Sequence, residues 1–538
     1  MKPHLGFYQC VDSSHSLRKF SFKKYKHFSK LKITKPSVNI NQNQQFSIIT
    51  KLSSSTKSLK HLNLSQYNLE NCCLSQLKLV AKKLFKITRL SLVGGSKKSL
   101  SLAQLMLKKP SSLRHLSLQH IFDVSSCQQL LRSMTRSKLK TIDLIPIFAV
   151  KYEPKWLLSF SSYCPSTVQE LSLYWKDQID GSRLKLSKKH LANLQKLELG
   201  IPLALNTFTN IVTSISDPSK LKSLQFQLER SKIEGLYLPD VQAFFGKCSN
   251  LEELDLKTDL DVYPMNSSFM KLRKFSVELN EGHLRIINFI QQQKDSLESL
   301  SLTTKNWKPN LTDGVLKELK SLKKLKKLKL NLKSDACFIK ALALVELIKA
   351  LECLEEVDFM DSLIEFKKGD FYNFWKALQK RSGCLRSLRL SLNAFKMDKN
   401  HSRIIIQTLM LLSRLEHLTL KDFTIEDPSF YIDLRELICF KNRRLNEVIL
   451  DEVKRVKTKA CCEILIQMLK AIIRKPSMKK FCYVEAKKYW FAFDFKGLEI
   501  LSLSEDVLKE VHHFNSLHLP SYTCKPPFSS VDFNSQKW

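Results

Sequence analysis

The sequence predicts an α/β solenoid, in which short parallel strands form one layer and helices form the other. Three observations lead to this fold class. The pattern L-x-x-L-x-L, or a close relative, occurs sixteen times in the 538 residues. Successive copies begin 21 to 31 residues apart, except for a last interval of 53. The segments between copies have apolar residues at helical spacing. A single strand–helix unit cannot bury its apolar side alone, so the units must stack.

Each copy of the pattern predicts one strand. The copies begin at Leu59, Ile87, Leu113, Leu139, Val168, Leu194, Leu221, Leu251, Leu272, Leu297, Leu325, Leu354, Leu385, Leu415, Leu445 and Leu498. A degenerate copy at Met478–Tyr483 lies inside the last interval. Leu17–Phe22 is similar to a first, divergent strand, as expected for a terminal unit that shields the core.

Helices are predicted between the strands. The clearest cases are Asn71–Phe85, Ala336–Leu351, Phe371–Leu378 and Glu463–Ile473, where apolar residues recur every three or four positions. Each would lay one apolar stripe against the strands.

The basic stretch 319–333 allows two interpretations. By itself it is typical of a basic amphipathic helix that binds membranes or calmodulin. The period of the repeat instead makes Leu325–Leu330 a strand and Val315–Lys324 the preceding helix. We favour the repeat interpretation.

These units resemble leucine-rich repeats of the ribonuclease-inhibitor-like type, whose units contain a full helix. The resemblance covers about residues 59–503 and implies a right-handed horseshoe, with strands on the concave wall and helices on the convex wall. The family usually places Asn or Cys three residues after the last strand leucine. Asn393 fits this position, but Tyr67, Ile121, Phe423 and Val453 occupy it elsewhere, which predicts turns held by apolar packing.

The pattern divides the chain into three parts. Residues 1–58 form a basic N-terminal arm and divergent cap, and residues 59–503 form the solenoid. Residues 504–538 form a C-terminal cap, with a helix near Val507–Phe514, and a tail that contains proline.

Charge is the second informative property. The formal net charge is +37 and the pI is about 9.6, which favours nucleic acid, acidic proteins or anionic membranes as partners. A lysine-rich composition spread over solvated helices, with no polyanion bound, explains the same numbers.

The charge is unevenly distributed. Side chains alternate across a strand, so three positions in each copy face away from the core; we call these 48 positions the strand strip. They comprise eight Lys or Arg and ten Asp or Glu, a net charge of −2, which leaves +39 for the rest of the chain. A strip that gripped nucleic acid would be rich in Lys and Arg, so we expect any polyanion to bind elsewhere.

The N-terminal arm is the candidate polyanion site. Residues 1–69 contain 12 Lys and Arg against the single acid Asp12, and Lys23, Lys24 and Lys26 are the candidate contacts. A targeting segment and a solvated cap remain open alternatives for this arm.

Candidate partner-binding residues combine aromatic and charged side chains of the strip and its margin. They are Tyr174, Glu253, Asp255, Lys274, Trp307, Lys327, Lys329, Asp358 and Arg389. Trp175 also lies just beyond a strand, and packing in the loops is an equally open explanation for the tryptophans.

No catalytic or cofactor motif was found. In Val93–Ser99 the second glycine is not at the position that a phosphate-binding loop requires, and His512 and His513 have no ligands at metal-binding spacing. The acids of the open strip lack a desolvated pocket. We therefore predict no catalytic residue, no metal, no cofactor and no small-molecule substrate.

The 14 cysteines form no disulfide or metal framework, and neither a secretory signal peptide nor a membrane-spanning apolar run is visible. We expect small buried thiols in an intracellular chain, in the cytoplasm first, with the nucleus and the mitochondrion left open. The predicted function is a non-catalytic scaffold that binds a protein on the concave strip. The alternative is a structural subunit of a nucleic-acid-containing assembly that uses its basic exterior and arm.

Overall fold

The computed structural model describes residues 30–32 and most of 59–500. The longer stretches outside this description are 65–68, 120–129, 146–163, 175–190, 229–237, 259–270, 333–337, 456–463 and 473–476. The predicted strand Leu17–Phe22 and the predicted helix Val507–Phe514 lie outside the described residues. The chain groups into two compact units, residues 1–275 (unit 1) and 276–538 (unit 2).

Unit 1 is a run of parallel strands. These are β1 (Lys30–Lys32), β2 (His61–Leu64), β3 (Arg89–Val93), β4 (His115–Gln119), β5 (Thr141–Ile145), β6 (Glu170–Tyr174), β7 (Lys196–Leu203), β8 (Ser223–Leu228) and β9 (Glu253–Thr258). Each strand pairs in parallel with the next along the chain. Its helices are α2 (Leu74–Lys83), α3 (Lys97–Lys108), α6 (Leu205–Val212), η4 (Pro218–Lys220) and α7 (Leu238–Lys247).

Unit 2 repeats this plan. After β10 (Lys274–Glu281), which crosses the boundary, come β11 (Ser299–Asn306), β12 (Lys327–Leu332), β14 (Glu356–Phe359), β16 (Ser387–Met397), β17 (His417–Ile425), β18 (Glu447–Arg455) and β19 (Lys480–Glu485). From β11 to β19 these strands are parallel neighbours. The helices are α8 (Leu284–Gln292), α9 (Pro309–Leu319), α10 (Ala341–Ala350), α11 (Asp370–Gln379), α12 (Lys399–Leu411), α13 (Ser429–Glu436) and the π-helical η5 (Leu437–Lys441). Two short strands, β13 (Ile339–Lys340) and β15 (Ile364–Glu365), pair with each other.

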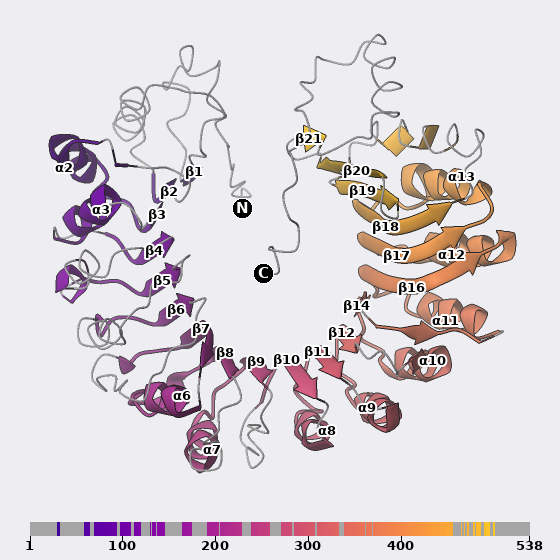
Figure 1. The fold of residues 1–538 in the computed structure, drawn as a ribbon, viewed down its shortest axis with the longest axis horizontal. Helices are drawn as coiled ribbons and strands as arrows, with labels where there is room; N and C mark the ends of the chain where they lie inside the picture. The colour runs from indigo at the N-terminus through magenta and orange to yellow at the C-terminus, as the bar shows by residue number, and fades with distance from the viewer. Residues whose placement is uncertain are drawn as a thin grey trace, which may run out of the picture. The chain divides into compact units, whose positions relative to one another are not determined.

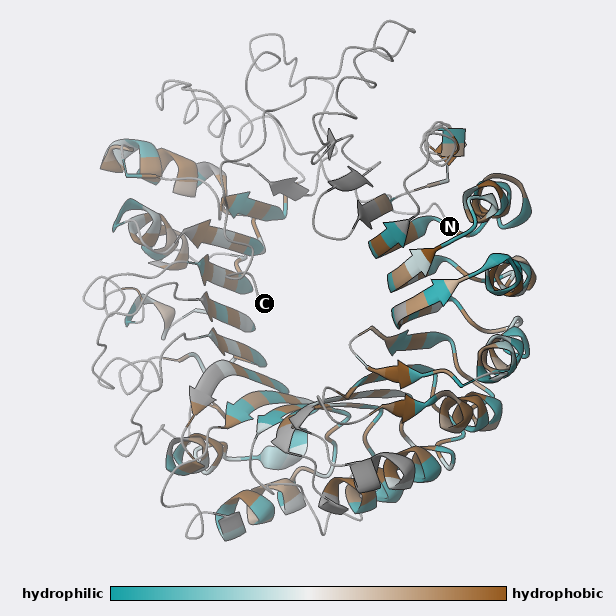
Figure 2. Ribbon diagram, turned by 45° about the vertical axis from the view of Figure 1, so that its right-hand side comes forward, coloured by the Kyte–Doolittle hydropathy of each residue, from teal (hydrophilic) through white to brown (hydrophobic). Residues whose placement is uncertain are grey.

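Within each unit the strands lie on the inside of the curve and the helices on the outside (Figure 1). Hydrophilic and hydrophobic residues alternate along the strands (Figure 2), and one face of strands such as β8 and β9 is buried. Leu254 of β9 and Leu328 of β12 are each 1% exposed. Buried leucines of this kind fill the space between strands and helices, which confirms the predicted α/β solenoid.

The parallel run stops at the C-terminal end of the described chain. β19 is parallel to β18, as the degenerate copy predicted, but β20 (Tyr489–Asp494) pairs antiparallel with β19. β21 (Glu499–Ile500) then pairs antiparallel with β20. The prediction of one more parallel repeat at Leu498 is therefore wrong. Only three residues join β19 to β20, whereas a parallel crossover needs about a dozen.

The predicted helices are present with shifted ends. α2, α10 and α11 lie within two to five residues of the predicted bounds, and described residues of 463–473 are helical. The helix predicted at Val315–Lys324 is instead α9, which starts at Pro309 and ends at Leu319. A turn follows at once, because the Ser321 hydroxyl donates to the Glu318 carbonyl and Leu322 is buried. β12 confirms the predicted strand of this basic stretch.

The turns after the strands of unit 2 follow the predicted mixture. The Asn393 amide donates to the Ile364 carbonyl at 3.3 Å, so it bonds the turn of the preceding repeat. Phe423 and Val453, at the same position of the next two repeats, are fully buried. Asn393, Asp422 and Glu452 have positive φ angles of 50°, 51° and 52°. These three repeats thus bend the chain through one left-handed residue, two or three positions after the last strand leucine.

Candidate functional site

The parallel register aligns the strand strip into columns. Equivalent positions of neighbouring repeats are direct partners, for example Ser172 with Glu198 and Lys329 with Asp358. Neighbouring strands are about 5 Å apart, so each exposed side chain touches the equivalent side chain of the next repeat. The chemistry of the strip therefore depends on which residues share a column.

A tyrosine is held in place at the centre of the unit 1 strip. Tyr174, the last residue of β6, lies beside Gly200 of β7 in the register. Its ring covers the glycine so closely that a Cβ at position 200 would lie 2.2 Å from Tyr174 Cδ1. The Tyr174 hydroxyl donates a hydrogen bond to Glu198 Oε1, and Ser172 Oγ donates to Glu198 Oε2 at 3.2 Å. We call Ser172, Tyr174, Glu198 and Gly200 the tyrosine patch.

The acids around this patch resist ionisation. Burial raises the pKa of Glu198, and the charges of Asp143 and Asp255 raise it further, against the hydrogen bond from Ser172. Burial also raises the pKa of Asp143, with Glu170 acting in the same direction. Lys196 Nζ lies 3.3 Å from Glu198 Oε2. Because this carboxylate keeps a raised pKa despite the nearby ammonium, burial is the dominant effect.

The unit 2 strip is organised as cross-strand charge pairs. The paired atoms are Lys327 Nζ and Glu356 Oε1 at 2.6 Å, and Arg389 Nη1 and Asp358 Oδ2 at 2.8 Å. His417 Nδ1 is in hydrogen-bond contact with Glu447 Oε2 at 3.0 Å. Lys480 also approaches Glu447, at 3.7 Å. Each pair joins two neighbouring strands, so most charges of this strip are already neutralised by the chain itself. Exposed pairs of this kind contribute little to stability, typically about 0–1 kcal/mol.

Lys329 is the exception in this arrangement. It is exposed in the middle of β12, between Ser301 and Asp358 in the register. Asp358 pairs with Arg389, and no ion pair to Lys329 is found among the described residues. Its ammonium is therefore available to a partner.

The predicted site residues divide into four groups. Tyr174 belongs to the tyrosine patch, and Lys327, Lys329, Asp358 and Arg389 form one section of the unit 2 strip. Glu253 and Lys274 are ion-paired with each other in unit 1, and Asp255 lies next to Glu253 on the strip. Trp307, Trp175, Lys23, Lys24 and Lys26 lie outside the described residues.

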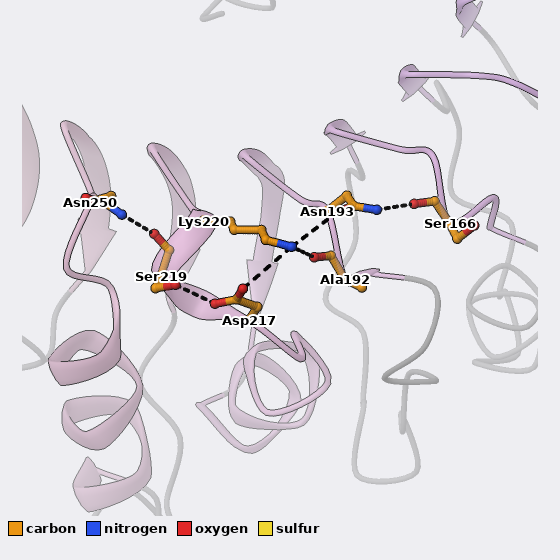
Figure 3. A network of polar contacts seen from close by, with 7 residues as sticks. All are labelled: Ser166, Ala192, Asn193, Asp217, Ser219, Lys220 and Asn250. Carbon is orange, nitrogen blue, oxygen red and sulfur yellow. Dashed lines mark hydrogen bonds and ion pairs between the residues drawn. The ribbon is translucent and has the colours of Figure 1, made fainter.

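Sequence reasoning missed a second polar system, at the loops that enter the strands of unit 1 (Figure 3). Asn193 Nδ2 donates to the Ser166 carbonyl at 2.9 Å, and Asn250 Nδ2 donates to the Ser219 carbonyl at 2.8 Å. Lys220 Nζ donates to the Ala192 carbonyl at 3.0 Å. Asn193, Lys220 and Asn250 each directly precede the first leucine of a copy. An alignment of the repeats would therefore have shown that polar residues recur at this position. Because each bond joins neighbouring repeats, its role is structural.

The described residues also include thiols and potential metal ligands outside the strip. No group of three or more His, Cys, Asp or Glu is arranged to hold a metal ion within the described ranges. Burial raises the pKa of the Cys164 and Cys248 thiols to about 12, which makes them inert, as expected for small buried residues. Cys73 and Cys353 are exposed instead. None of the described helices is both long and apolar enough to cross a membrane.

The regular return of strand, turn and helix decides the classification. The chain has a leucine-rich-repeat fold. Most repeats of unit 2, and several of unit 1, contain a helix between successive strands. No protein-family model and no curated protein sequence matches the chain.

Solved structures with a similar chain path include leucine-rich-repeat proteins. A TLR13–ssRNA13 complex matches with 15% identity over 87% of this chain and 67% of that chain, at a TM-score of 0.40. The complex of Rad7 and Elc1 in yeast matches with 18% identity over 62% of this chain and 86% of that chain, at a TM-score of 0.35. The leucine-rich repeat-containing protein LegL7 from Legionella pneumophila matches with 14% identity over 66% of this chain and 97% of that chain, at a TM-score of 0.31. The partners named in those complexes belong to those proteins.

Proposed function

We propose that this chain is a non-catalytic interaction protein that binds a protein partner on its strand strip. The observation that carries the proposal is the tyrosine patch, where Gly200 and Glu198 fix the ring of Tyr174 in one orientation. Tyrosines that are already ordered lose little conformational entropy on binding and are common anchors in protein interfaces.

The charges of the strip support a protein as the partner. Acids and bases are mixed on it, so no section offers the continuous positive surface that nucleic acid requires. Lys329 provides an unpaired cation on the strip of unit 2, while the paired residues around it can accept and donate hydrogen bonds. Such a lattice recognises a polar protein surface by complementarity rather than by charge alone.

The test is affinity purification of the tagged chain from cell lysate, with and without nuclease, over a salt series. The strip variant combines Tyr174→Ala with Lys329→Glu, and the matched control is Lys317→Glu on α9, which changes the charge equally outside the strip. We expect a protein that is recovered with the control, resists nuclease and is lost with the strip variant. Equal recovery with both variants would contradict the proposal.

The charge distribution favours one other candidate function, a structural subunit of a nucleic-acid-containing assembly. The residues outside the strip carry a net charge of +39, and the basic arm is part of this charge. This alternative is supported if recovery is abolished by nuclease and falls steeply with salt, with a slope reduced by about one for each phosphate contact removed from Lys23, Lys24 or Lys26.

A further inference from the structure

The helices α10 to α13 of unit 2 have the same pattern of buried positions. Buried residues include Ala341, Phe371, Ser402 and Tyr431, one in each helix, followed three residues later by Leu344, Phe374, Ile405 and Leu434. The four helices therefore present equivalent positions to solvent in equivalent places. The residue after the first buried one is Leu342, Tyr372, Arg403 or Ile432, and we call these four the outer row.

Three members of the outer row are large apolar side chains left in solvent. Leu342 is 53% exposed, Tyr372 is 51% exposed and Ile432 is 41% exposed. Single exposed apolar residues are ordinary on protein surfaces, but here they recur at one position of stacked helices. Packing of the core does not require these apolar side chains, because other residues of each helix face the core and are buried.

The middle of the outer row is positively charged. Lys376 lies one turn after Tyr372, with Nζ 5.6 Å from the ring centroid, and Lys399 lies one turn before Arg403. Lys376 and Lys399 have no carboxylate partner among the described residues. At the two ends of the row, Glu346 is neutralised by Lys349 at 2.9 Å, and Glu436 is 3.5 Å from Lys441. The row thus has three apolar side chains, with the unneutralised Lys376 and Lys399 beside its centre, and Arg403 interacts electrostatically with Asp433 of α13.

The spacing of the row matches that of an α-helix. Packed helices lie about 8–10 Å apart, so the four positions span about 30 Å. A helix returns to the same face after seven residues, a rise of about 10.5 Å. A helix laid across α10 to α13 would therefore present one apolar residue to each row position over about 20 residues. The outer row is narrow, because the polar residues Asn373 and Gln407 are exposed on the same helices. A narrow apolar row favours a helix as the partner over a flat membrane surface.

We infer that the outer row is a second docking surface, which binds an acidic amphipathic helix of a protein partner. The apolar face of that helix would cover Leu342, Tyr372 and Ile432, and acids on its flanks would pair with Lys376, Lys399 and Arg403. This surface lies on the helical side of unit 2, so it goes beyond the function proposed for the strand strip and leaves the strip accessible.

The test measures binding of a labelled helical peptide of about 20 residues, with leucines at heptad positions a and d and glutamates at e and g. We expect saturable micromolar binding to the full chain by fluorescence anisotropy. The row variant (Leu342→Ser, Tyr372→Ser, Ile432→Ser) should weaken it at least tenfold, and the charge variant (Lys376→Glu, Lys399→Glu) should do the same. The control (Leu411→Ser, Phe440→Ser) removes residues that are 50% and 69% exposed outside the row and should bind normally.

Three results would overturn the inference. These are absence of binding at 100-fold the expected concentration, equal loss in the control and row variants, or equal affinity for a peptide with lysines at e and g. Vesicles with anionic lipid are the remaining arm. If they bind the chain and the row variant abolishes that binding while the acidic peptide fails, the row is a membrane contact and the inference is wrong. Circular dichroism melting of every variant shows whether it remains folded.

Discussion

The ring of Tyr174 occupies the space beside Gly200 of the neighbouring strand, where a methyl group would lie 2.2 Å from the Cδ1 atom of the ring. Because Gly200 has no side chain, the ring of Tyr174 from the previous repeat has room beside it. The same contact brings the hydroxyl to Glu198, two residues before the glycine. The orientation of the ring is therefore set by the backbone of its neighbour.

Replacing Gly200 by Ala should displace Tyr174 and break its hydrogen bond to Glu198. The ring can rotate into solvent, so we expect a loss of about 1 kcal/mol in unfolding free energy, the typical value of one hydrogen bond. Urea denaturation in a double-mutant cycle checks this. In a Tyr174→Ala background the same substitution should cost almost nothing, and an undiminished cost there would show that the glycine serves the backbone instead.

Glu198→Gln should gain stability relative to the wild type as the pH rises. The folded-state pKa of Glu198 is raised by burial, so the unfolded chain ionises first and the wild type loses stability through that pH range. At low pH both forms are neutral and differ little. Denaturation of the proteins between pH 3 and 7 measures the trend on both sides of the ordinary glutamate pKa. Glu346→Gln is the control, with the opposite slope, because its hydrogen bond to Lys349 lowers the pKa of Glu346.

Leu328→Asp should destabilise unit 2 by several kcal/mol, on the order of 4 kcal/mol, because it places an unpaired charge among buried leucines. Leu254→Asp should do the same to unit 1. Both side chains are 1% exposed. Ser301→Asp, on the exposed face of β11, should change the free energy of unfolding by less than about 0.5 kcal/mol. Comparable losses for Leu328→Asp and Ser301→Asp would contradict the assignment of the two faces.

Asn442→Ala should cost more than Asn250→Ala. Asn442 is 3% exposed; its amide donates to the Leu412 carbonyl at 3.1 Å, and its Oδ1 accepts from the amides of Arg444 and Leu445. Losing these partners in the interior should cost about 2–3 kcal/mol. Asn250 is exposed and donates one bond, so about 1 kcal/mol is expected. Thermal unfolding of the two variants gives the order directly.

Cys73 should react with iodoacetamide long before Cys164 or Cys248. Its hydrogen bond with Ser75, at 3.0 Å, lowers the pKa of this exposed thiol, whereas burial raises the pKa of the other two to about 12. Mass spectrometry of time-limited labelling at pH 8 measures the order. Ser75→Ala should slow labelling of Cys73 alone, and all three thiols should react after denaturation in urea.

The fold was predictable because the repeat determines it. A leucine pattern with a period near that of one strand and one helix leaves few other ways to bury the apolar side chains. The alternation along β9 and β12 follows from the pleat. Element ends were less predictable, as at α9, because hydrogen bonds such as that from Ser321 to Glu318 decide where a helix stops.

The site was only partly predictable. Tyr174 and Lys329 follow from their positions on the strip, but their states depend on neighbours. Gly200 matters because the register brings it beside Tyr174, and Lys329 is unpaired because Asp358 pairs with Arg389. The antiparallel strand β20 was missed because its sequence gives no repeat to align. The outer row was missed because exposure of a helical side chain depends on how the helices stack.

The charge pairs of unit 2 make the order of its repeats matter. Lys327 is matched by Glu356 one repeat later, and Asp358 is matched by Arg389 one repeat after that. Excision of the repeat that contains β14 would restore a continuous sheet but place Lys329 beside Arg389. Repeat proteins commonly gain and lose whole units by duplication and deletion. In this chain such a deletion would bring the like charges of Lys329 and Arg389 together. Its repeats therefore cannot be removed or exchanged without an electrostatic cost.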